Sequence, residues 1–312
     1  MIQRRDLMLG AIAAGGAGPV LNAAAEDTAV SGPSPLLSRP DTFSLALGGG
    51  AAKAFAHIPV LEAMDDLGVR PAEIAATSMG AILGGFYASG LSGREVREIT
   101  VDLFTRKPQL LQKLFLKNGR TWASLFNMMR PAIIDPVVLF ETVFPDGVAD
   151  SFTDLRVPMK IIATDFHTQS QVVLDRGPLL PAIAASSSLP MLLTPVSIDG
   201  RVLIDGGFVN PTPFDVLQGN GHLGIAVDVT SSTFARRKGL PSGLDTWIGS
   251  ISITMHSLVA AKLACSRPDL LIEPPVGQFK TMDFFKIEAI LTAAEPAGEA
   301  FKRGLAALLD RP

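Results

Sequence analysis

The chain has 312 residues, of which 47% are apolar and 18% are charged, so it can bury a large core, and an aromatic content of 6% makes that core mainly aliphatic. A formal net charge of -3 argues against nucleic acid as a main partner. The one cysteine, Cys265, excludes an intramolecular disulfide framework and is expected on a buried helix face, and the four histidines show no spacing typical of a metal site.

The first 25 residues have the features of an export signal. An arginine pair at 4–5 precedes an apolar run over about 7–21, and small residues at 23–25 suit a cleavage site. The run is short for a membrane span, so an uncleaved anchor is the less favoured alternative. The arginine pair resembles a twin-arginine signal. We therefore predict a signal peptide over 1–25, a linker over 26–41, and export to the periplasm or the outside of a bacterial cell.

The folded domain is predicted to span 42–312 and to open with a strand, a glycine-rich turn and a helix. The strand covers 43–47, the turn reads Gly48-Gly49-Gly50-Ala51-Ala52-Lys53, and the helix covers about 55–67. Such a turn can cradle a phosphate, but the Gly-Lys-Ser/Thr ending of a P-loop is absent and the third Rossmann glycine position is not filled. Its successive backbone N–H groups can instead hold an oxyanion.

A serine lies in the second strand–turn–helix unit, Ala76-Thr77-Ser78-Met79-Gly80. An apolar run over 74–76 leads into it, and a helical segment follows over 81–88. A sharp turn of this kind lifts the Ser78 hydroxyl out of the sheet and over the helix N-terminus, where backbone N–H groups favour negative charge. A helix N-cap serine is the alternative. Ala76 stands where the usual pattern has Gly, and its methyl group is expected to alter or tighten the turn.

Basic and apolar residues alternate between 106 and 122. The favoured interpretation is an ordinary cap helix with buried leucines and solvated lysines, and a lid or a peripheral membrane contact is the alternative. A short helix follows over about 137–143, after Asp135-Pro136. The residues that form the alternating pattern are Arg106, Lys107, Lys113, Lys117 and Arg120, with Leu110, Leu111, Leu114, Phe115, Leu116 and Trp122 between them.

Beyond 159 the pattern alternates between strands and helices. The expected elements are strands at 159–164 and 171–174, a helix at 180–187, a hairpin with strands at 196–198 and 202–204, a strand at 222–229, a helix at 246–264, a strand at 268–272, and a helical stretch over 284–309 in which Pro296 marks a break or a new start.

The second hairpin strand ends in Asp205-Gly206-Gly207. A carboxylate at a strand end lies where open α/β sheets place their chemistry. A turn residue is the plainer alternative, because Asp-Gly is the commonest turn pair, as at Asp199-Gly200. Asp165, Asp175 and Asp228 are rival acids at strand ends, each more typical of a cap or a turn.

Taken in order, the glycine-rich loop, the serine turn and Asp205-Gly206-Gly207 resemble the patatin-like phospholipase family. The opening block 45–61, the segment Ala185-Ser186-Ser187-Ser188-Leu189-Pro190 and the strand at 268–272 are similar to further blocks of that family, so the resemblance covers about 43–290. It implies a three-layer α/β/α fold with a mainly parallel central sheet and helices on both sides.

The family implies a Ser–Asp dyad without histidine. Ser78 would be the nucleophile and Asp205 the base that takes its proton. Backbone N–H groups of Gly49, Gly50 and Ala51 would form the oxyanion hole, in which the loss of one donor typically costs on the order of 10²–10³ in rate. The supporting positions of these motifs are Gly48, Lys53, Gly80, Gly206 and Gly207.

The chain departs from the family at several positions of the loop. Ala51 and Ala54 stand where the family usually has Gly, Pro59 where a Gly often sits, and Lys53 in place of the commoner Arg. Ala51 keeps its N–H, so the oxyanion hole survives if its backbone angles suit alanine. His57, one helical turn beyond the loop, is expected to hydrogen-bond nearby backbone rather than to act in a triad.

The resemblance therefore implies a phospholipase A or lipid acyl hydrolase, with a phospholipid or another fatty-acyl ester as substrate and neither a metal nor an organic cofactor. Two alternatives stay open. One is an esterase or thioesterase of the same fold that acts on small esters. The other is a weakly active or inactive lipid-binding homologue, which Ala51, Ala54 and Ala76 favour and the intact Ser78 and Asp205 oppose.

Overall fold

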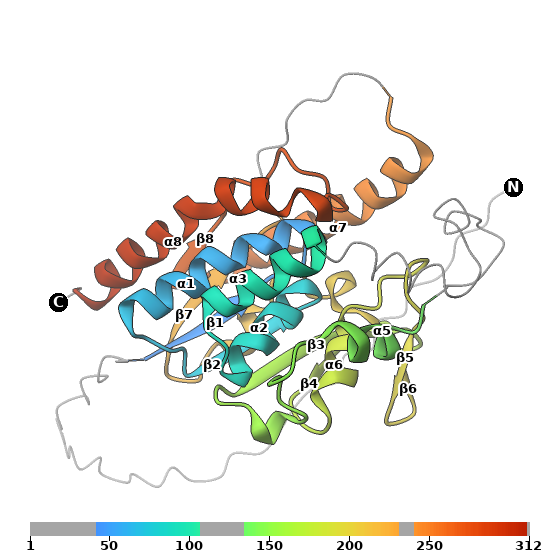
Figure 1. Cartoon of the computed structure of the whole chain (residues 1–312), viewed down its shortest axis with the longest axis horizontal. Coiled ribbons are helices and arrows are strands. Elements are labelled where there is room, and N and C mark those ends of the chain that lie inside the picture. The colour runs from blue at the N-terminus through green and yellow to red at the C-terminus, as the bar shows by residue number, and fades with distance from the viewer. Residues whose placement is uncertain (1–41, 107–133, 231–239, 311–312) are drawn as a thin grey trace, which may run out of the picture. The chain divides into compact units, whose positions relative to one another are not determined.

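The computed structural model describes residues 42–106, 134–230 and 240–310, all of which belong to one compact unit, Pro40–Pro312 (Figure 1). The predicted signal peptide over 1–25 and the predicted linker over 26–41 lie outside the described residues. So does the basic segment beyond Arg106.

The described residues form an eight-stranded sheet with the strand order β5-β6-β3-β2-β1-β7-β8, and β4 also pairs with β3. The strands β3, β2, β1, β7 and β8 run parallel, whereas β4, β5 and β6 join as antiparallel strands. Their bounds are Phe43–Leu47 for β1, Glu73–Thr77 for β2, Met159–Asp165 for β3, Ser170–Leu174 for β4, Val196–Ile198 for β5, Arg201–Asp205 for β6, Leu223–Val227 for β7 and Leu270–Ile272 for β8.

Helices follow most of the strands. The α-helices are α1 (Ile58–Leu67), α2 (Met79–Ser89), α3 (Gly93–Val101), α5 (Pro136–Val143), α6 (Leu179–Ser186), α7 (Gly243–Cys265) and α8 (Ile287–Leu309). Shorter turns are the 3-10 segments η1 (Ala51–His57), η4 (Phe152–Asp154), η5 (Gly206–Phe208), η6 (Phe214–Leu217) and η7 (Phe284–Lys286), and the π-helical turn η2 (Asp102–Arg106).

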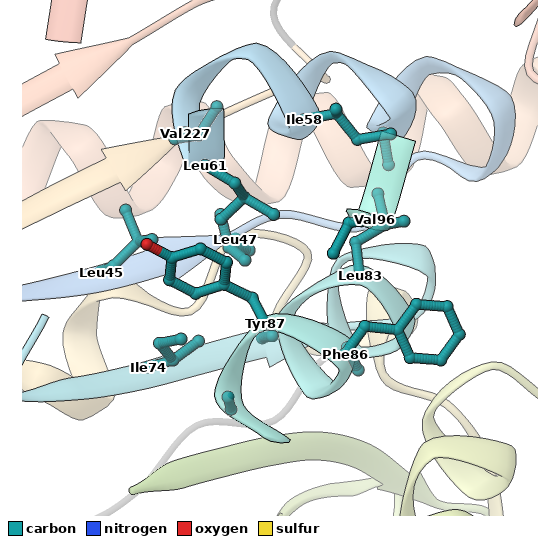
Figure 2. Packing of buried hydrophobic residues seen from close by; sticks show 14 of the residues in the cluster. Leu45, Leu47, Ile58, Leu61, Ile74, Leu83, Phe86, Tyr87, Val96 and Val227 are labelled. Carbon is teal, nitrogen blue, oxygen red and sulfur yellow. The ribbon is translucent and has the colours of Figure 1, made fainter. Parts of the chain in front are cut away.

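The expected three-layer fold is confirmed, and the helical layers on the two faces of the sheet differ in thickness. On one face of the sheet, leucines and isoleucines of the strands pack against α1, α2, α3, α6 and α8, as Figure 2 shows around Leu45, Leu47 and Ile74. On the other face, the strands present small side chains such as Ala46. The turn η6 and the C-terminal part of α7 lie there, because alanines let a thin layer approach closely.

The C-terminal ends of β2 and β6 meet on one edge of β3. The strand β4 occupies the other edge of β3, in antiparallel pairing. The shared edge is divided: β2 pairs in parallel up to Thr77, opposite Ile162, and β6 pairs in antiparallel fashion up to Asp205, opposite Ala163. The two strands therefore point at one another end to end, which places the residues after Thr77 beside Asp205.

Three local predictions differ from the structure. Pro296 does not break the last helix, since α8 runs unbroken from Ile287 to Leu309 with the proline inside it. A proline removes one backbone donor, and the buried face that includes Ile290 and Phe301 holds the helix against the core on both sides of it. Cys265 is not buried: it is the exposed last residue of α7. The predicted helix at 55–67 begins instead as the 3-10 turn η1.

Candidate active site

Ser78 occupies a strained turn between β2 and α2. Its backbone has φ 54 and ψ -125, in a region that a residue with a side chain rarely adopts and that typically costs about 1–3 kcal/mol. The following helix passes so close to β1 that a Cβ at Gly80 would lie 2.5 Å from the carbonyl oxygen of Leu47. Ala76 lies inside β2, fully buried and outside the positive-φ positions, so the conformational demand falls on Ser78 itself.

The side chains of Ser78 and Asp205 are in direct contact. The Ser78 Oγ donates a hydrogen bond of 2.7 Å to Oδ2 of Asp205. The other carboxylate oxygen, Oδ1, accepts the backbone N–H of Gly207 at 2.8 Å, which fixes the carboxylate plane with Oδ2 towards the serine. Gly206 must lack a side chain, because a Cβ there would lie 2.2 Å from the carbonyl oxygen of Ile162.

Burial makes Asp205 a stronger base than an aspartate in water. The side chain is 6% exposed, and desolvation raises its pKa from 3.8 to about 6. The hydrogen bonds from Gly207 and Ser78 oppose this rise, because they stabilise the carboxylate. Asp205 is therefore ionised at neutral pH, while its pKa lies near the range at which a general base works best.

Of the three loop N–H groups expected to form an oxyanion hole, one already has a backbone acceptor. The Gly49 N–H donates to the carbonyl oxygen of Pro211 at 2.8 Å, so in this conformation it is not available to an oxyanion, contrary to the expectation for Gly49. No backbone acceptor among the described residues takes the N–H of Gly50 or Ala51. Ala51 adopts φ 48, the left-handed conformation for which glycine is the usual residue.

The remaining motif residues hold this loop in shape. A Cβ at Gly48 would lie 2.7 Å from the Thr212 hydroxyl, so the loop needs glycine there. Lys53 is buried in η1, and its N–H donates to the carbonyl oxygen of Gly50 at 3.2 Å, which closes the turn. His57 is fully buried, and its Nε2 donates to the Gly48 carbonyl oxygen at 2.7 Å.

His57 hydrogen-bonds the glycine-rich loop, as expected, and makes no hydrogen bond to Ser78 or Asp205 among the described residues. Its burial lowers its pKa to about 4, so the ring is neutral at neutral pH and supports the loop as a hydrogen-bond donor. The rival acids are also occupied. Asp165 accepts backbone N–H groups at 3.0 Å as a turn residue, Asp228 accepts the hydroxyls of neighbouring threonines, and Asp175 lies beside Arg176.

The sequence analysis missed the role of Ser186. The backbone N–H of Ser78 donates to the Ser186 Oγ at 2.8 Å, and that hydroxyl donates in turn to the carbonyl oxygen of Ile162 at 2.6 Å. Ser186 thus fixes the turn that presents the Ser78 hydroxyl. The signal was visible in Ala185-Ser186-Ser187-Ser188-Leu189-Pro190, which supported the family resemblance but carried no assigned role.

A cavity of about 380 Å³ opens beside Ser78 and Asp205, and its walls are almost entirely apolar. Gly50 and Ala51 line it together with Ser78 and Asp205, so the loop and the two side chains border the same space. Within the described residues, no group of three or more His, Cys, Asp or Glu could hold a metal ion. Side chains in the wall include Ile82, Phe86, Phe104, Phe140, Phe144, Ile251, Met255 and Phe284.

Comparison with known proteins gives a family match. The family model for patatin-like phospholipase matches residues 45–217. An uncharacterised NTE family protein of Mycobacterium tuberculosis is 33% identical over 195 residues, which cover 61% of this chain and 49% of that protein. A lysophospholipase of Candida glabrata is 26% identical over 296 residues, 84% of this chain and 16% of that protein. The chain thus spans about half or less of the length of these relatives.

Among solved structures, VipD from Legionella pneumophila aligns with a TM-score of 0.49 at 12% sequence identity, over 86% of this chain and 67% of that one.

Proposed function

Because this chain belongs to the patatin-like phospholipase family, we propose that it hydrolyses acyl esters of lipids with Ser78 as the nucleophile and Asp205 as the general base. The observation that carries the proposal is the 2.7 Å hydrogen bond between Ser78 Oγ and Asp205 Oδ2 at the wall of an apolar cavity. A nucleophile in hydrogen-bond reach of a base, and a base oriented by a third group, are the geometric signature of such catalysis.

The first half of the reaction transfers the acyl group to the enzyme. Ser78 Oγ attacks the ester carbonyl carbon while Asp205 Oδ2 takes the hydroxyl proton. The tetrahedral intermediate places its negative oxygen towards the N–H groups of Gly50 and Ala51, which border the cavity and donate to no backbone acceptor among the described residues. When the carbon–oxygen bond breaks, protonated Asp205 returns the proton to the leaving alcohol.

The second half releases the fatty acid. Asp205 takes a proton from a water molecule, which attacks the acyl-enzyme carbonyl. The second tetrahedral intermediate collapses, the bond to Ser78 Oγ breaks, and Asp205 returns the proton to the serine. The net change is ester plus water to alcohol plus acid, and the enzyme is restored. The Gly207 N–H keeps Oδ2 aimed at Ser78 throughout.

The wall of the cavity supports a fatty-acyl group as the part of the substrate that binds. Two aromatic clusters lie in that wall: Phe144 packs on Phe86 and Phe140 at centroid distances of 4.9 and 5.1 Å, and Phe104 stacks on Phe284 at 5.4 Å. Such surfaces gain free energy by removing methylene groups from water, at about 0.8 kcal/mol per group. We propose a phospholipid or lysophospholipid as the source of the acyl group.

Labelling with a fluorophosphonate probe tests the dyad. The wild-type protein should be labelled, whereas Ser78→Ala should not and Asp205→Ala should be labelled much more slowly. Equal labelling of Ser78→Ala would refute the nucleophile. Hydrolysis of p-nitrophenyl butyrate and palmitate then separates the alternatives, since a lipid hydrolase should prefer the long chain and a small-ester esterase the short one. A folded wild-type protein that binds lipid without labelling or turnover would establish the binding-only alternative.

The pH dependence gives a second test. Since Asp205 must be ionised to act as a base and its pKa is about 6, kcat/KM for a soluble ester should fall about tenfold per pH unit below pH 6 and level off above pH 7. A profile governed by a group with a pKa near 4 would contradict the proposed environment of Asp205.

We also propose, from the sequence of residues 1–25, that the protein is exported by the twin-arginine route. N-terminal sequencing of the protein from fractionated cells should give a start near Glu26. Replacing Arg4 and Arg5 by Lys should hold the precursor in the cytoplasm. Export of the doubly substituted precursor at the normal rate would refute the route, and a mature protein that starts at residue 1 would refute the signal peptide.

A further inference from the structure

The helix α7 is apolar and yet exposed. Among the described residues, one helix, Asp245–Cys265, is long and apolar enough to cross a membrane by length and composition, and only 6% of its most apolar stretch is buried. Between Asp245 and Lys262 it carries no Asp, Glu, Lys or Arg, a length of about 24 Å at 1.5 Å per residue. A helix of this kind in water usually turns its apolar residues inward.

The inner face of α7 belongs to the catalytic centre. Trp247, Ile251 and Met255 line the cavity. A Cβ at Gly207 would lie 2.9 Å from the terminal methyl of Met255, so the helix packs directly on the turn that orients Asp205. At its C-terminal end, the Lys262 ammonium group binds the Asp215 carboxylate. These contacts attach α7 along its length to the body of the protein, as a helix that lies on the protein surface.

The outer face of α7 has hydroxyl groups whose hydrogen bonds are already made. Thr246 donates to the carbonyl oxygen of Ser242 at 2.8 Å, Ser250 to that of Trp247 at 2.7 Å, and Ser257 to that of Ile253 at 2.9 Å. A hydroxyl satisfied by its own helix needs no water, so its transfer to an apolar medium avoids most of the usual cost of an unpaired polar group.

Large apolar side chains are exposed around the same region. Ile253 in the centre of the outer face is 64% exposed, and Leu240, just before the helix, is 99% exposed. Phe285, which also lines the cavity, is 59% exposed. The apolar wall of the cavity thus continues through α7 onto the outside of the protein.

We infer that the outer face of α7, with Leu240 and Phe285 beside it, docks on the acyl layer of a phospholipid surface. The inference rests on the proposed function, because the substrate of a lipid hydrolase lies in such a layer. Between Asp245 and Lys262, α7 offers no Asp, Glu, Lys or Arg to a headgroup, and Lys286 beside Phe285 is paired with Asp283. Docking therefore depends mainly on apolar burial and persists at high salt. Docking sets one wall of the cavity against the lipid, from which an acyl chain reaches Ser78 without crossing water.

Flotation of the full-length chain with phosphatidylcholine vesicles in about 0.5 M NaCl tests the docking. The wild-type protein and Ser78→Ala should float equally well, because docking precedes chemistry. Ile253→Asp should lower the vesicle partition coefficient at least tenfold, the effect expected from losing one buried isoleucine. Val173→Asp is the matched control, since Val173 is exposed on β4 and does not line the cavity.

Two activities separate docking from chemistry. Ile253→Asp should retain wild-type hydrolysis of p-nitrophenyl butyrate and lose phospholipid hydrolysis in vesicles. If Ile253→Asp does not fold, Ala260→Glu on the same exposed face decides by the same measurements. If the wild-type protein floats but hydrolyses no ester, and Ile253→Asp does not float, the docking surface is supported and the proposed function is refuted.

Three results would overturn the inference. One is a wild-type protein that hydrolyses soluble esters but does not float. Another is flotation of both Ile253→Asp and Ala260→Glu at the wild-type level. The third is a wild-type dimer by light scattering that Ile253→Asp converts to monomers with flotation unchanged, since the outer face of α7 would then bind a second copy of the chain.

Discussion

Replacing Asp205, the proposed general base, should stabilise the protein and abolish the proposed ester hydrolysis. The pKa of Asp205 is about 6 in the folded protein and 3.8 for an aspartate exposed to water, as in the unfolded chain. The folded protein therefore binds this proton more tightly than the unfolded chain does. The stability that this proton contributes is complete below about pH 3.8 and is lost as the pH rises through 6. A difference of about 2 pKa units corresponds to about 3 kcal/mol.

Asp205→Asn removes that dependence. Its side-chain carbonyl can accept the Gly207 N–H in place of Oδ1, and its amide can donate to the Ser78 Oγ, so both contacts of the carboxylate survive. At pH 8 the variant should therefore be more stable than the wild-type protein by up to about 3 kcal/mol, or roughly 6–12 °C in Tm. Near pH 4 the two proteins should differ little. Ester hydrolysis should fall at least about 10²-fold.

Urea unfolding of both proteins at one-unit intervals from pH 4 to pH 8 measures the difference. The gain should grow between pH 4 and pH 6 and remain constant above pH 7. A variant that is less stable than wild type at pH 8, or a gain that does not change with pH, would show that burial does not raise the pKa of Asp205.

Three further substitutions test the turn and the loop. Gly80→Ala should lower the free energy of unfolding by at least about 3 kcal/mol and abolish fluorophosphonate labelling, because its Cβ meets backbone oxygen atoms. Gly84→Ala in the same helix meets only side-chain ends, so it should still be labelled. Equal behaviour of the two variants would contradict the close approach of α2 to β1. Ser186→Ala should lower kcat about tenfold with little change in KM, since it frees the Ser78 N–H without touching substrate; a change in KM alone would refute this positioning role. Ala51→Gly should change the free energy of unfolding by less than about 1 kcal/mol, because relief of the positive φ is offset by the greater freedom of glycine in the unfolded chain. A loss above about 2 kcal/mol in chemical denaturation would show instead that the Ala51 methyl group makes stabilising contacts in the folded protein.

Much of the fold follows from short-range pattern. The strand at 43–47, the short helix that Asp135 caps and the hairpin turning at Asp199-Gly200 all have their determinants within a few residues, and the structure confirms each of them. The order of Gly-rich loop, serine and Asp-Gly-Gly carried the family resemblance, and the family match agrees with it. Local pattern and motif order are sufficient for these features because no distant contact decides them.

The features that the sequence did not reveal depend on distant partners. The hydrogen bond from the Ser78 N–H to Ser186 joins residues 108 positions apart, and the acceptor of the Gly49 N–H is the carbonyl of Pro211. Neither acceptor is implied by a local pattern. Cys265 was expected on a buried helix face but is exposed, because the sequence of 246–264 does not show which side of α7 packs on the body of the protein.

The hairpin turn at Asp199-Gly200 has a consequence for catalysis. Both residues adopt positive φ, at 51 and 75, and the turn pairs Ile198 with Arg201. Successive side chains of a strand point to opposite faces. The turn sets where β6 begins, and a shift of β6 by one position along β3, where Asp205 lies opposite Ala163, would turn the Asp205 carboxylate to the other face of the sheet, away from Ser78. A tight turn that ends five residues before Asp205 thus helps to set the position of its carboxylate. Insertions that an exposed loop usually tolerates would here separate Ser78 from Asp205 and so remove the proposed activity without unfolding the protein.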